Sequence, residues 1–481
     1  MDSVTATPRP LILDLDGTLS RTDTLVESLL RLAATHPLAG LSAVLALRHG
    51  RAAFKAKVAS GVRLDPATLV YNDDVLALAH AARAAGRPVY LVTAADQHIA
   101  DDVAAHHGFF DGVFGSDGVH NLRGAAKADF LVSRFGARGF DYVGDAAADL
   151  PVWRQSARAY VVAPGPAGLS AASLGGAELH GVGTAPGLSA RLRLLARALR
   201  VHQWAKNVLV FLPLVAAHLF SAAAVTQALL GFAAFSLCAS SVYVLNDLLD
   251  LPHDRLHATK RKRPFASGLL PVSQAPPLLA VTFGGGFAIA AFLPWRFFVL
   301  LGVYYACTLS YSLVLKRQAI WDVMMLAVLY ALRVLAGCAA ISIGVSPWLL
   351  AFSLFLFFSL AVVKRQTELV QHVRAGKAAK LGGRAYMPED LDMLRSMAAS
   401  SGYMAVLVMA LYVDSPAVRV LYRHPLYLWT LCPLLLFWIS RVLMLSDRGE
   451  MHDDPVVFAL RDRVSLAVGV VAGCVFLAGA L

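Results

Sequence analysis

The feature that most limits the possible folds of this chain is a series of long apolar segments in its C-terminal part. They lie near residues 205–222, 224–246, 275–293, 297–315, 320–341, 348–364, 397–413, 425–444 and 464–481. Each has roughly the 20 residues that an α-helix needs to cross the hydrocarbon core of a bilayer. Because a chain in lipid must satisfy its own backbone hydrogen bonds, we expect helices here. The sequence therefore predicts an all-α membrane domain of about nine transmembrane helices.

The rest of the chain has a different composition, which predicts a second domain. Overall, 57% of the 481 residues are hydrophobic and 16% are charged, which excludes an ordinary soluble enzyme. The charges are frequent before residue 190, and glycine-rich and proline-rich turns occupy 164–168 and 181–187. We therefore expect a soluble domain over 1–165, a linker over 166–194 and the membrane domain over 195–481.

The basic residues of the loops predict the orientation in the membrane. Lys and Arg are frequent in every second loop, at Arg255, 260–263, 316–317, 364–395, Arg448, Arg461 and Arg463, whereas the alternate loops hold Arg296, Arg419 and Arg423. By the positive-inside rule, the basic loops are cytoplasmic. The chain is thus predicted to be a multi-pass protein of the inner (plasma) membrane with its N-terminal domain and phosphate-binding loops in the cytoplasm.

In the N-terminal domain, acidic residues follow short apolar stretches that are typical of buried strands. The stretch that begins at Leu11 ends in two acids, Asp14 and Asp16. A second stretch ends at Thr93, and a third ends at Gly144 and Asp145. Polar side chains at the carboxyl ends of strands in an α/β sheet lie where ligands bind. The pattern predicts an α/β domain with a site at this edge of the sheet.

This ordered set, with Lys127 between the second and third stretches, resembles the four motifs of the haloacid dehalogenase superfamily of phosphohydrolases. The resemblance implies a Rossmann-like domain in which Asp14 attacks phosphorus and forms an aspartyl-phosphate. It implies that Asp16 protonates the leaving oxygen and then activates water. Thr93 and Lys127 are then expected to bind the transferring phosphoryl group.

The same resemblance implies a Mg²⁺ site. Its ligands are expected to be Asp14, the backbone carbonyl of Asp16, and Asp145, with Asp149 orienting the site. Asp149 has an alternative interpretation as an acid that stabilises the N-terminus of a helix.

A small helical cap is expected over about residues 20–75, because Leu25, Leu29 and Leu32 share one helix face. In this superfamily such a cap closes over the substrate. Lys55, Lys57 and Arg63 can then meet a sugar or a second phosphate, or they can lie on a solvated face or touch anionic lipid heads.

At the end of the apolar stretch 236–245, three carboxylates follow at helical spacing. Asp247, Asp250 and Asp254 fall on one helix face, where like charges repel unless a divalent cation neutralises them. The basic run 260–263 follows at once, which suits a Mg²⁺-diphosphate ligand. In the alternative interpretation, these acids are a solvated helix end paired with Arg255, Lys260 and Arg263.

The run from Asn246 to Asp254, followed by Lys260–Pro264, resembles the first signature of the UbiA superfamily of intramembrane prenyltransferases. Residues 200–207, 311–316 and 454–462 are most similar to the branch that makes polyprenyl-phosphoryl-ribose from phosphoribosyl pyrophosphate. The resemblance implies that Asp247, Asp250 and Asp254 hold Mg²⁺ against the diphosphate, with Asp247 and Asp250 catalytic. It implies substrate-binding roles for Lys206, Asn246, Lys260, Arg263 and Lys316.

The second half of the membrane domain departs from the prenyl-transferring members. Where those members repeat an aspartate-rich motif, this chain has bases, and the candidates for binding a polyprenyl monophosphate are Lys364, Arg365, Glu368, Arg384 and Tyr386. Ammonium and guanidinium groups bind phosphate directly. We expect the neighbouring Arg374, Lys377 and Lys380 only to set topology.

Two charged residues lie inside one predicted span. Asp322 and Arg333 are eleven residues apart, so both can face the interior of the bundle. Asp322 is expected to bind ribose hydroxyls or to help hold the metal. For Arg333, a structural bond to backbone carbonyls and a role in binding both remain open.

Together the two resemblances imply a bifunctional enzyme of cell wall biosynthesis. The membrane domain is expected to join a polyprenyl phosphate to phosphoribosyl pyrophosphate with Mg²⁺, and the N-terminal domain to remove the 5-phosphate of the product. One alternative is an isoprenoid-diphosphate transferase that acts on an aromatic or lipid acceptor. Another is a transferase with a non-catalytic, regulatory N-terminal domain. The lipid bilayer is an expected partner and nucleic acid is not, while the oligomeric state stays open.

Overall fold

The computed structural model describes residues 8–480 apart from 50, 118–120, 171, 375–383 and 452–453. Lys377 and Lys380, which we expected to set topology, lie outside the described residues. The chain forms two compact units. The first comprises Met1–Leu199 and Tyr243–Leu279, and the second comprises Arg200–Val242 and Ala280–Leu481. The chain passes between the units three times, once between Leu199 and Arg200 and twice within long helices.

The first unit contains a parallel sheet of six strands. The strands are β1 (Leu11–Leu13), β2 (Val89–Asp96), β3 (Gly112–Ser116), β4 (Asp141–Gly144), β5 (Arg158–Val162) and β6 (Glu178–Val182). Their order is β3-β2-β1-β4-β5-β6, so β1 lies between β2 and β4. The predicted α/β domain is confirmed. Because β6 pairs with β5, part of the stretch predicted as a linker belongs to the sheet, while the domain limits themselves stay a prediction.

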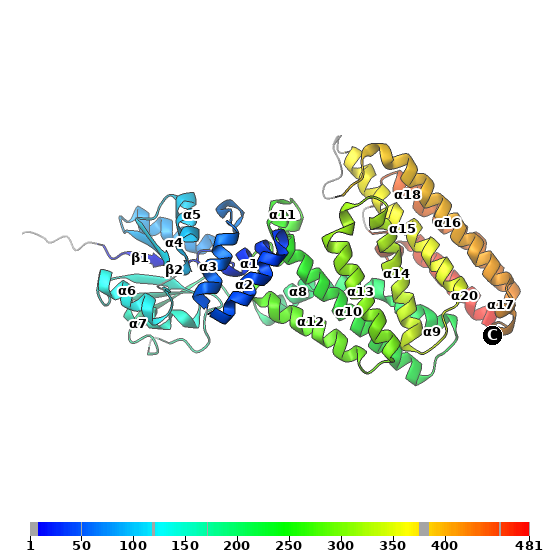
Figure 1. The fold of residues 1–481 in the computed structure, drawn as a ribbon, viewed down its shortest axis with the longest axis horizontal. Helices are drawn as coiled ribbons and strands as arrows, with labels where there is room; N and C mark the ends of the chain where they lie inside the picture. The colour runs from blue at the N-terminus through cyan, green and yellow to red at the C-terminus, as the bar shows by residue number, and fades with distance from the viewer. Residues whose placement is uncertain are drawn as a thin grey trace, which may run out of the picture. The chain divides into compact units, whose positions relative to one another are not determined.

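Helices cover both faces of the sheet. Figure 1 shows α4 (Asp73–Ala84) and α5 (Gln97–His107) on one side and α6 (Ala125–Phe135) and α7 (Leu150–Gln155) on the other. Since side chains alternate along a strand, Leu11 and Leu13 enter one apolar core and Ile12 enters the other. Burial on both faces explains why β1 is apolar throughout.

A helical cap follows β1. It consists of α1 (Thr24–Thr35), α2 (Pro37–Leu45), η1 (Ala46–His49) and α3 (Arg51–Gly61), and a short helix, η2 (Pro66–Thr68), leads back to the sheet. The side chain of Asp23 caps α1 by accepting a hydrogen bond from the Val26 amide at 3.0 Å. Leu32 and Val58 are buried in the small core between the cap helices. The predicted cap is confirmed.

The first unit also includes α8 (Leu188–Ala198) and the connection after the first long apolar helix. That connection contains α11 (Leu251–Leu256), η5 (Lys260–Lys262) and η6 (Val272–Gln274). Leu251, Phe265 and Leu270 are buried in one apolar cluster, against which Val26 and Leu30 of α1 pack. The stretch with the acidic and basic signature is therefore folded within this unit.

The second unit is helical. Its long helices are α10 (Ala222–Leu249), α12 (Ala275–Ala290), α13 (Trp295–Leu313), α14 (Trp321–Ala340), α15 (Pro347–Arg374), α16 (Leu391–Asp414), α18 (Leu431–Asp447) and α20 (Arg463–Ala480), of which α10 and α12 extend into the first unit. Shorter helices are η4 (Val201–Phe211), α9 (Leu212–Ala216), η7 (Leu315–Arg317), η8 (Pro388–Asp390), α17 (Pro416–Leu421), η9 (Pro425–Thr430) and α19 (Pro455–Ala459).

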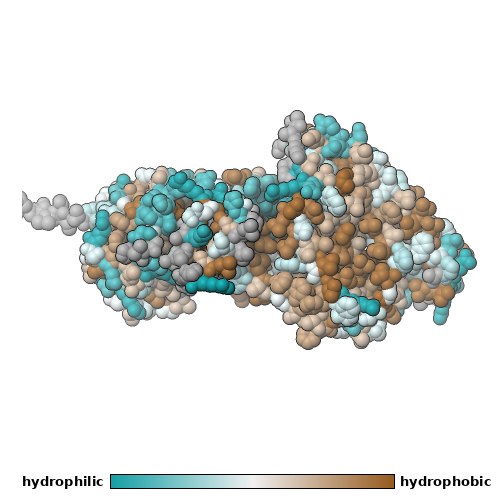
Figure 2. Space-filling view, in the orientation of Figure 1, coloured by the Kyte–Doolittle hydropathy of each residue, from teal (hydrophilic) through white to brown (hydrophobic). Residues whose placement is uncertain are grey.

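Eight helices in the described part of the chain are long and apolar enough to cross a membrane. Figure 2 shows apolar residues gathered on the outside of this helical part. The protein is an integral membrane protein. We expected about nine spans, but the first segment, near 205–222, is instead divided between η4 and α9. Pro213 at the start of α9 has no amide hydrogen to continue the preceding helix, which accounts for the break.

Candidate functional site

Two acids follow β1 directly and lie at the carboxyl edge of the sheet. Asp14 is 9% exposed, and its Oδ1 accepts a hydrogen bond from the Leu15 amide at 2.9 Å. Asp16 points toward the start of the cap, where its Oδ1 accepts from the Thr24 amide at 2.8 Å. The two carboxylates thus have different surroundings, as two different chemical roles require.

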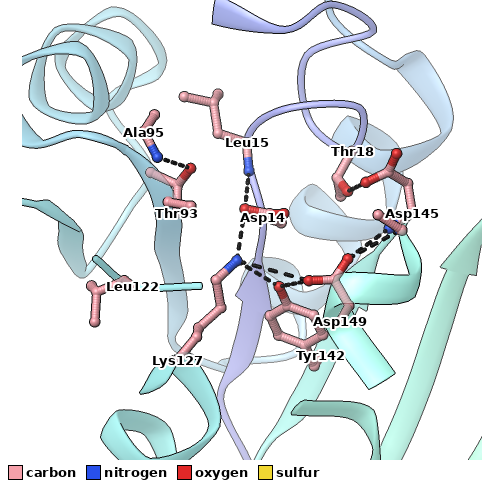
Figure 3. A network of polar contacts seen from close by, with 12 residues as sticks. Asp14, Leu15, Thr18, Thr93, Ala95, Leu122, Lys127, Tyr142, Asp145 and Asp149 are labelled. Carbon is pink, nitrogen blue, oxygen red and sulfur yellow. Dashed lines mark hydrogen bonds and ion pairs between the residues drawn. The ribbon is translucent and has the colours of Figure 1, made fainter. Parts of the chain in front are cut away.

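Lys127 of α6 reaches the first of these acids. Its Nζ lies 3.0 Å from Asp14 Oδ1 and 2.9 Å from the Tyr142 hydroxyl, while Asp149 Oδ1 is 3.9 Å away (Figure 3). The lysine is 2% exposed, and a cation so deeply buried requires anionic partners. The ammonium group is therefore held where it can neutralise the charge of an anion bound beside Asp14.

Three carboxylates gather around the same point. Ligand atoms of Asp14, Asp145 and Asp149 lie within 4.8 Å of one another, and among the described residues they form the one such group of acids, histidines or cysteines. Burial raises the pKa of Asp145 to about 7, and the charges of Asp14 and Asp149 add to this. Carboxylate oxygens are the ligands that Mg²⁺ prefers, and a divalent cation removes such repulsion. The residues present therefore fit a Mg²⁺ ion.

Asp16 contributes no side-chain oxygen to this group, which is compatible with the expected use of its backbone carbonyl. Burial raises the pKa of Asp16 to about 8, and the nearby Asp23 adds to this. An aspartic acid that keeps its proton near neutral pH can donate that proton to a leaving oxygen.

Asp149 combines both interpretations of its sequence position. Its Oδ2 accepts hydrogen bonds from the amides of Asp145 and Ala146, at 3.3 and 3.1 Å, just before α7. Its Oδ1 accepts from the Tyr142 hydroxyl at 2.8 Å. The residue thus fixes the loop that carries Asp145, and it also belongs to the acidic group. Tyr142 joins Lys127 to Asp149, although no sequence pattern pointed to it.

The cations expected in the cap separate into two sets. Lys55 lines the same cavity as Asp14 and Thr93, and its Nζ donates to the Ala94 carbonyl at 2.9 Å. Arg63 instead forms an exposed pair with Asp102, with Nε 2.8 Å from Oδ2, and Lys57 is exposed. Thr93 lies inside β2 rather than at its end, and its hydroxyl accepts from the Ala95 amide at 3.0 Å.

Gly17 is required by the geometry of this site. Its φ is +76°, and a Cβ there would lie 2.2 Å from Asp145 Oδ2. Gly17→Ala should therefore displace the Asp145 carboxylate and lower the phosphate hydrolysis expected of this site at least tenfold, since roughly 1 Å of misplacement can cost about two decades of rate.

The matched control for this substitution is Gly86→Ala. Gly86 has φ +71° but nothing within 4 Å of the added atom, so it isolates the backbone cost of about 1–2 kcal/mol. Phosphate release and thermal unfolding of both variants provide the measurement. Equal activity losses would mean that Asp145 tolerates displacement.

Two of the three acids at and just after the end of the first long apolar helix, Asp247 and Asp254, form ion pairs with one arginine. Arg263 Nη1 lies 3.1 Å from Asp247 Oδ1 and 2.5 Å from Asp254 Oδ2, and both acids are 2% exposed. Asp247, Asp250 and Asp254 do not form a group as close as the one around Asp14 in the described structure. Arg263 pairs with these acids as the alternative interpretation predicted. Its guanidinium lies between the carboxylates of Asp247 and Asp254. Asn246 and Asp250 are half-buried, and Lys260 is exposed on η5.

In the second unit, Asp454 brings together two predicted phosphate-binding lysines. Its Oδ2 lies 2.9 Å from Lys206 Nζ and 2.8 Å from Lys364 Nζ, while its Oδ1 accepts from the Val456 amide and caps α19. Burial alone would raise the pKa of the Asp454 carboxyl, but the two ammonium groups hold it well below its ordinary value. We missed Asp454 as a site residue, although its position before Pro455 is typical of a helix N-cap.

A second polar cluster joins Asp322 to the basic loop. Arg365 Nε lies 2.5 Å from Asp322 Oδ2, and the Tyr386 hydroxyl donates to Asp322 Oδ1. Arg365 also contacts Glu368 and donates to the Tyr311 hydroxyl at 3.0 Å. The remaining predicted residues, Arg384 and Lys316, join this cluster, because Arg384 Nη1 donates to Tyr311 and to the Lys316 carbonyl. The structure thus brings six predicted residues into one cluster, in which Arg365 and Arg384 both donate to Tyr311, a residue that the sequence did not single out as a site residue.

Arg333 has structural partners. It donates to Asn207 Oδ1 at 2.9 Å, to the Tyr304 hydroxyl at 3.0 Å and to the Leu329 carbonyl, and its guanidinium lies over the rings of Tyr304 and Tyr330. This agrees with the structural interpretation of the residue.

The UbiA prenyltransferase family model matches residues 207–462, which is more than half of the chain. The chain belongs to this family.

Relatives of this UbiA-family protein cover different parts of it. It is 38% identical to the uncharacterized protein y4nM of Sinorhizobium fredii over 97% of this chain and 90% of that protein. It is 36% identical to nodulation protein NoeC of Azorhizobium caulinodans, over 58% of this chain and 92% of NoeC. It is also 33% identical to decaprenyl-phosphate phosphoribosyltransferase of Corynebacterium glutamicum, over 44% of this chain and 65% of that enzyme. The part of the chain that the UbiA model matches is thus related to decaprenyl-phosphate phosphoribosyltransferase.

Proposed function

We propose that this protein transfers a 5-phosphoribosyl group from phosphoribosyl pyrophosphate to a polyprenyl phosphate, and that its α/β domain then hydrolyses the 5-phosphate of the lipid product. The observation that carries the proposal is the site around Asp14. Its acids and buried lysine suit cleavage of a phosphomonoester, and they are joined to a domain related to an enzyme whose product bears such an ester.

For the transfer step, the proposal uses residues of both signatures. Asp247, Asp250 and Asp254 would hold Mg²⁺, which would neutralise the leaving diphosphate. Arg263 already lies on two of these acids, so it is placed to contact the same diphosphate. A polyprenyl phosphate oxygen attacks C1 of the ribose as the diphosphate leaves. Positioning and charge stabilisation suffice for this chemistry.

For the acceptor, the proposal assigns the cations that face Asp454 and Asp322. Lys206 and Lys364 share Asp454, and Arg365 pairs with Asp322 and Glu368, while Arg365 and Arg384 both reach a tyrosine. Among the described residues, neither cluster holds a close group of three acids that could bind a metal, so its ammonium and guanidinium groups suit a phosphate monoester better than a metal-bound diphosphate. This makeup supports phosphoribosyl transfer over the alternative of an isoprenoid-diphosphate donor. By the charge of the loops, we place these sites on the cytoplasmic side.

For the hydrolysis step, Asp14 attacks phosphorus while Asp16 gives its proton to the leaving hydroxyl. Lys127 and Thr93 bind the phosphoryl oxygens. Mg²⁺ held by Asp14, Asp145 and the Asp16 carbonyl, with Asp149 supporting, would offset the repulsion between nucleophile and phosphate. Asp16, now deprotonated, then takes a proton from the water that cleaves the aspartyl-phosphate. Tethering the two sites raises the effective concentration of the second for the product of the first.

The direct test uses the purified full chain with Mg²⁺, labelled phosphoribosyl pyrophosphate and polyprenyl phosphates of several lengths. Mass spectrometry of the lipid should find polyprenyl-phosphoryl-ribose without its 5-phosphate. Transfer of an isoprenoid group from a diphosphate, with no reaction of phosphoribosyl pyrophosphate, would establish the alternative function instead.

Lys364→Ala should weaken binding of polyprenyl phosphate more than binding of phosphoribosyl pyrophosphate. A charge-assisted hydrogen bond contributes roughly 1.5–3 kcal/mol, or about one to two decades in KM. Steady-state kinetics with each substrate varied provide the measurement, and Arg384→Ala should act in the same direction. Arg419→Ala, at an exposed surface pair with Asp414, is the control. If only the pyrophosphate substrate binds more weakly, the two sites are reversed.

A further inference from the structure

The connection that carries the transferase signature is bound to the cap of the phosphatase within the first unit. Arg255 of α11 donates to both oxygens of Glu27 on α1, at 2.5 and 2.9 Å, and to the Thr68 carbonyl at 3.1 Å. Both charged side chains are 6% exposed. A buried, bidentate pair of this kind fixes position as well as contributing energy.

Farther along the same connection, Gly268 packs against the side chains of Arg21 and Val70 in the phosphatase domain. Its φ is +67°, and a Cβ there would lie 2.9 Å from Arg21 Cβ and 3.2 Å from Val70 Cγ1. Leu270, two residues later, is buried in the cluster that Val26 and Leu30 of α1 join. The segment 264–274 is therefore held on the phosphatase by apolar packing as well as by the ion pair.

This docked segment forms part of the cavity that contains Asp14. The cavity has a volume of about 930 Å³, and residues 268–271, Ser273 and Gln274 line it together with the catalytic acids. Such a volume is that of a pocket for a ligand of drug size. A phosphomonoester with a small leaving group would leave much of it unfilled.

The rest of the cavity lining has its own chemistry. Arg21, Arg123 and Arg191 supply positive charge beside the acids Asp23, Asp74 and Asp96, whereas Leu194, Leu269 and Pro271 supply apolar surface. Guanidinium groups bind a phosphodiester well, and apolar side chains accommodate hydrocarbon. The pocket therefore matches a ligand that has a second phosphate and an apolar extension beyond its phosphomonoester.

We propose that segment 264–274 of the transferase connection is a specificity wall of the phosphatase pocket, which recognises the lipid-linked part of a sugar phosphomonoester joined through a phosphodiester to an apolar chain. This inference rests on the proposed function and adds the residues that select its substrate. The connection that contains α11 then has two roles. It carries the acidic and basic signature for the diphosphate, and its later residues form a wall of the phosphatase pocket.

The test compares two substrates of the full-length protein in detergent with Mg²⁺. They are farnesyl-phosphoryl-ribose 5-phosphate, a short lipid-linked substrate, and ribose 5-phosphate, and phosphate release gives kcat/KM for each. In the wild type, the lipid-linked substrate should be preferred at least tenfold. Ser273→Ala/Gln274→Ala should lower that ratio at least about fivefold, as expected from the loss of one or two hydrogen bonds. Leu269→Ala, at a separate lining position, should lower the ratio in the same direction.

The matched control is Gln155→Ala, at an exposed glutamine of α7 outside the cavity lining, which should keep the wild-type ratio. A wild type that cleaves only the soluble substrate would overturn the proposed function and the wall with it. A wild type that cleaves both substrates without preference would overturn the wall alone. A wild type that prefers the lipid-linked substrate, with wall variants that keep that preference, would overturn the wall alone. Equal losses for both substrates would make segment 264–274 a structural support, which also contradicts the proposal.

Discussion

Asp14→Asn should abolish phosphate release from the lipid product while the membrane domain continues to transfer phosphoribose. The substitution keeps nearly the same shape but removes the proposed nucleophile, so hydrolysis should fall at least about 10³-fold. It also removes an anionic partner of Lys127, which lies 3.0 Å from Asp14 Oδ1. The lipid should therefore accumulate as polyprenyl-phosphoryl-ribose that retains its 5-phosphate.

Mass spectrometry of the lipid after a single incubation distinguishes the two products, since they differ by one phosphate. Asp129→Asn, at an exposed acid on α6 near Lys127 in sequence, is the control and should release the dephosphorylated lipid. Identical lipids from Asp14→Asn and wild type, with transfer active in both, would show that the phosphatase acts on another phosphate ester.

Asp247→Asn should abolish transfer, to less than about a tenth of the wild-type rate, and leave phosphatase activity on added substrate. The carboxylate is 2% exposed and lies 3.1 Å from Arg263, so its charge acts where water screens it little. Metal-assisted stabilisation of a leaving diphosphate contributes several kcal/mol, which is the basis for the expected loss. Asp250→Asn should behave in the same way.

Transfer of labelled phosphoribose to a polyprenyl phosphate provides the measurement, with recovery of the variant in membranes as a check on folding. Asp414→Asn is the matched control, because its carboxylate is exposed and pairs only loosely with Arg419 at 3.5 Å. More than a tenth of wild-type transfer in both signature variants would exclude these acids as ligands of an essential metal.

Much of the site around Asp14 could be predicted from the sequence, because β1, β2 and β4 are parallel neighbours. Residues at the carboxyl ends of such strands must meet at one edge, whatever the loops between them do. Asp14 and Asp145 came together for this reason. Tyr142 could not be predicted, because on sequence alone a tyrosine inside a buried strand does not differ from a packing residue, yet its hydroxyl links Lys127 to Asp149.

In the membrane half, too, some features could be predicted from the sequence and others could not. Apolar segments of bilayer length were enough to predict helices, and the described residues include eight such helices. The break near Pro213 was missed because hydropathy averages over a window and does not register one absent amide hydrogen. Lys206 and Lys364 were singled out by local similarity, but their shared partner Asp454 lies 90 residues or more away in sequence.

The sequence by itself therefore determined the two fold classes, the cap and the residue types available for phosphate and metal chemistry. Each of these depends on periodicity, composition or spacing within a few turns of chain. Only the tertiary structure decided which charges share a partner and which segments line a common cavity, such as Arg255 on Glu27 and residues 268–274 beside Asp14. A buried charge takes whichever opposite charge the fold places within about 4 Å, and that choice depends on the packing of distant segments rather than on neighbours in the chain.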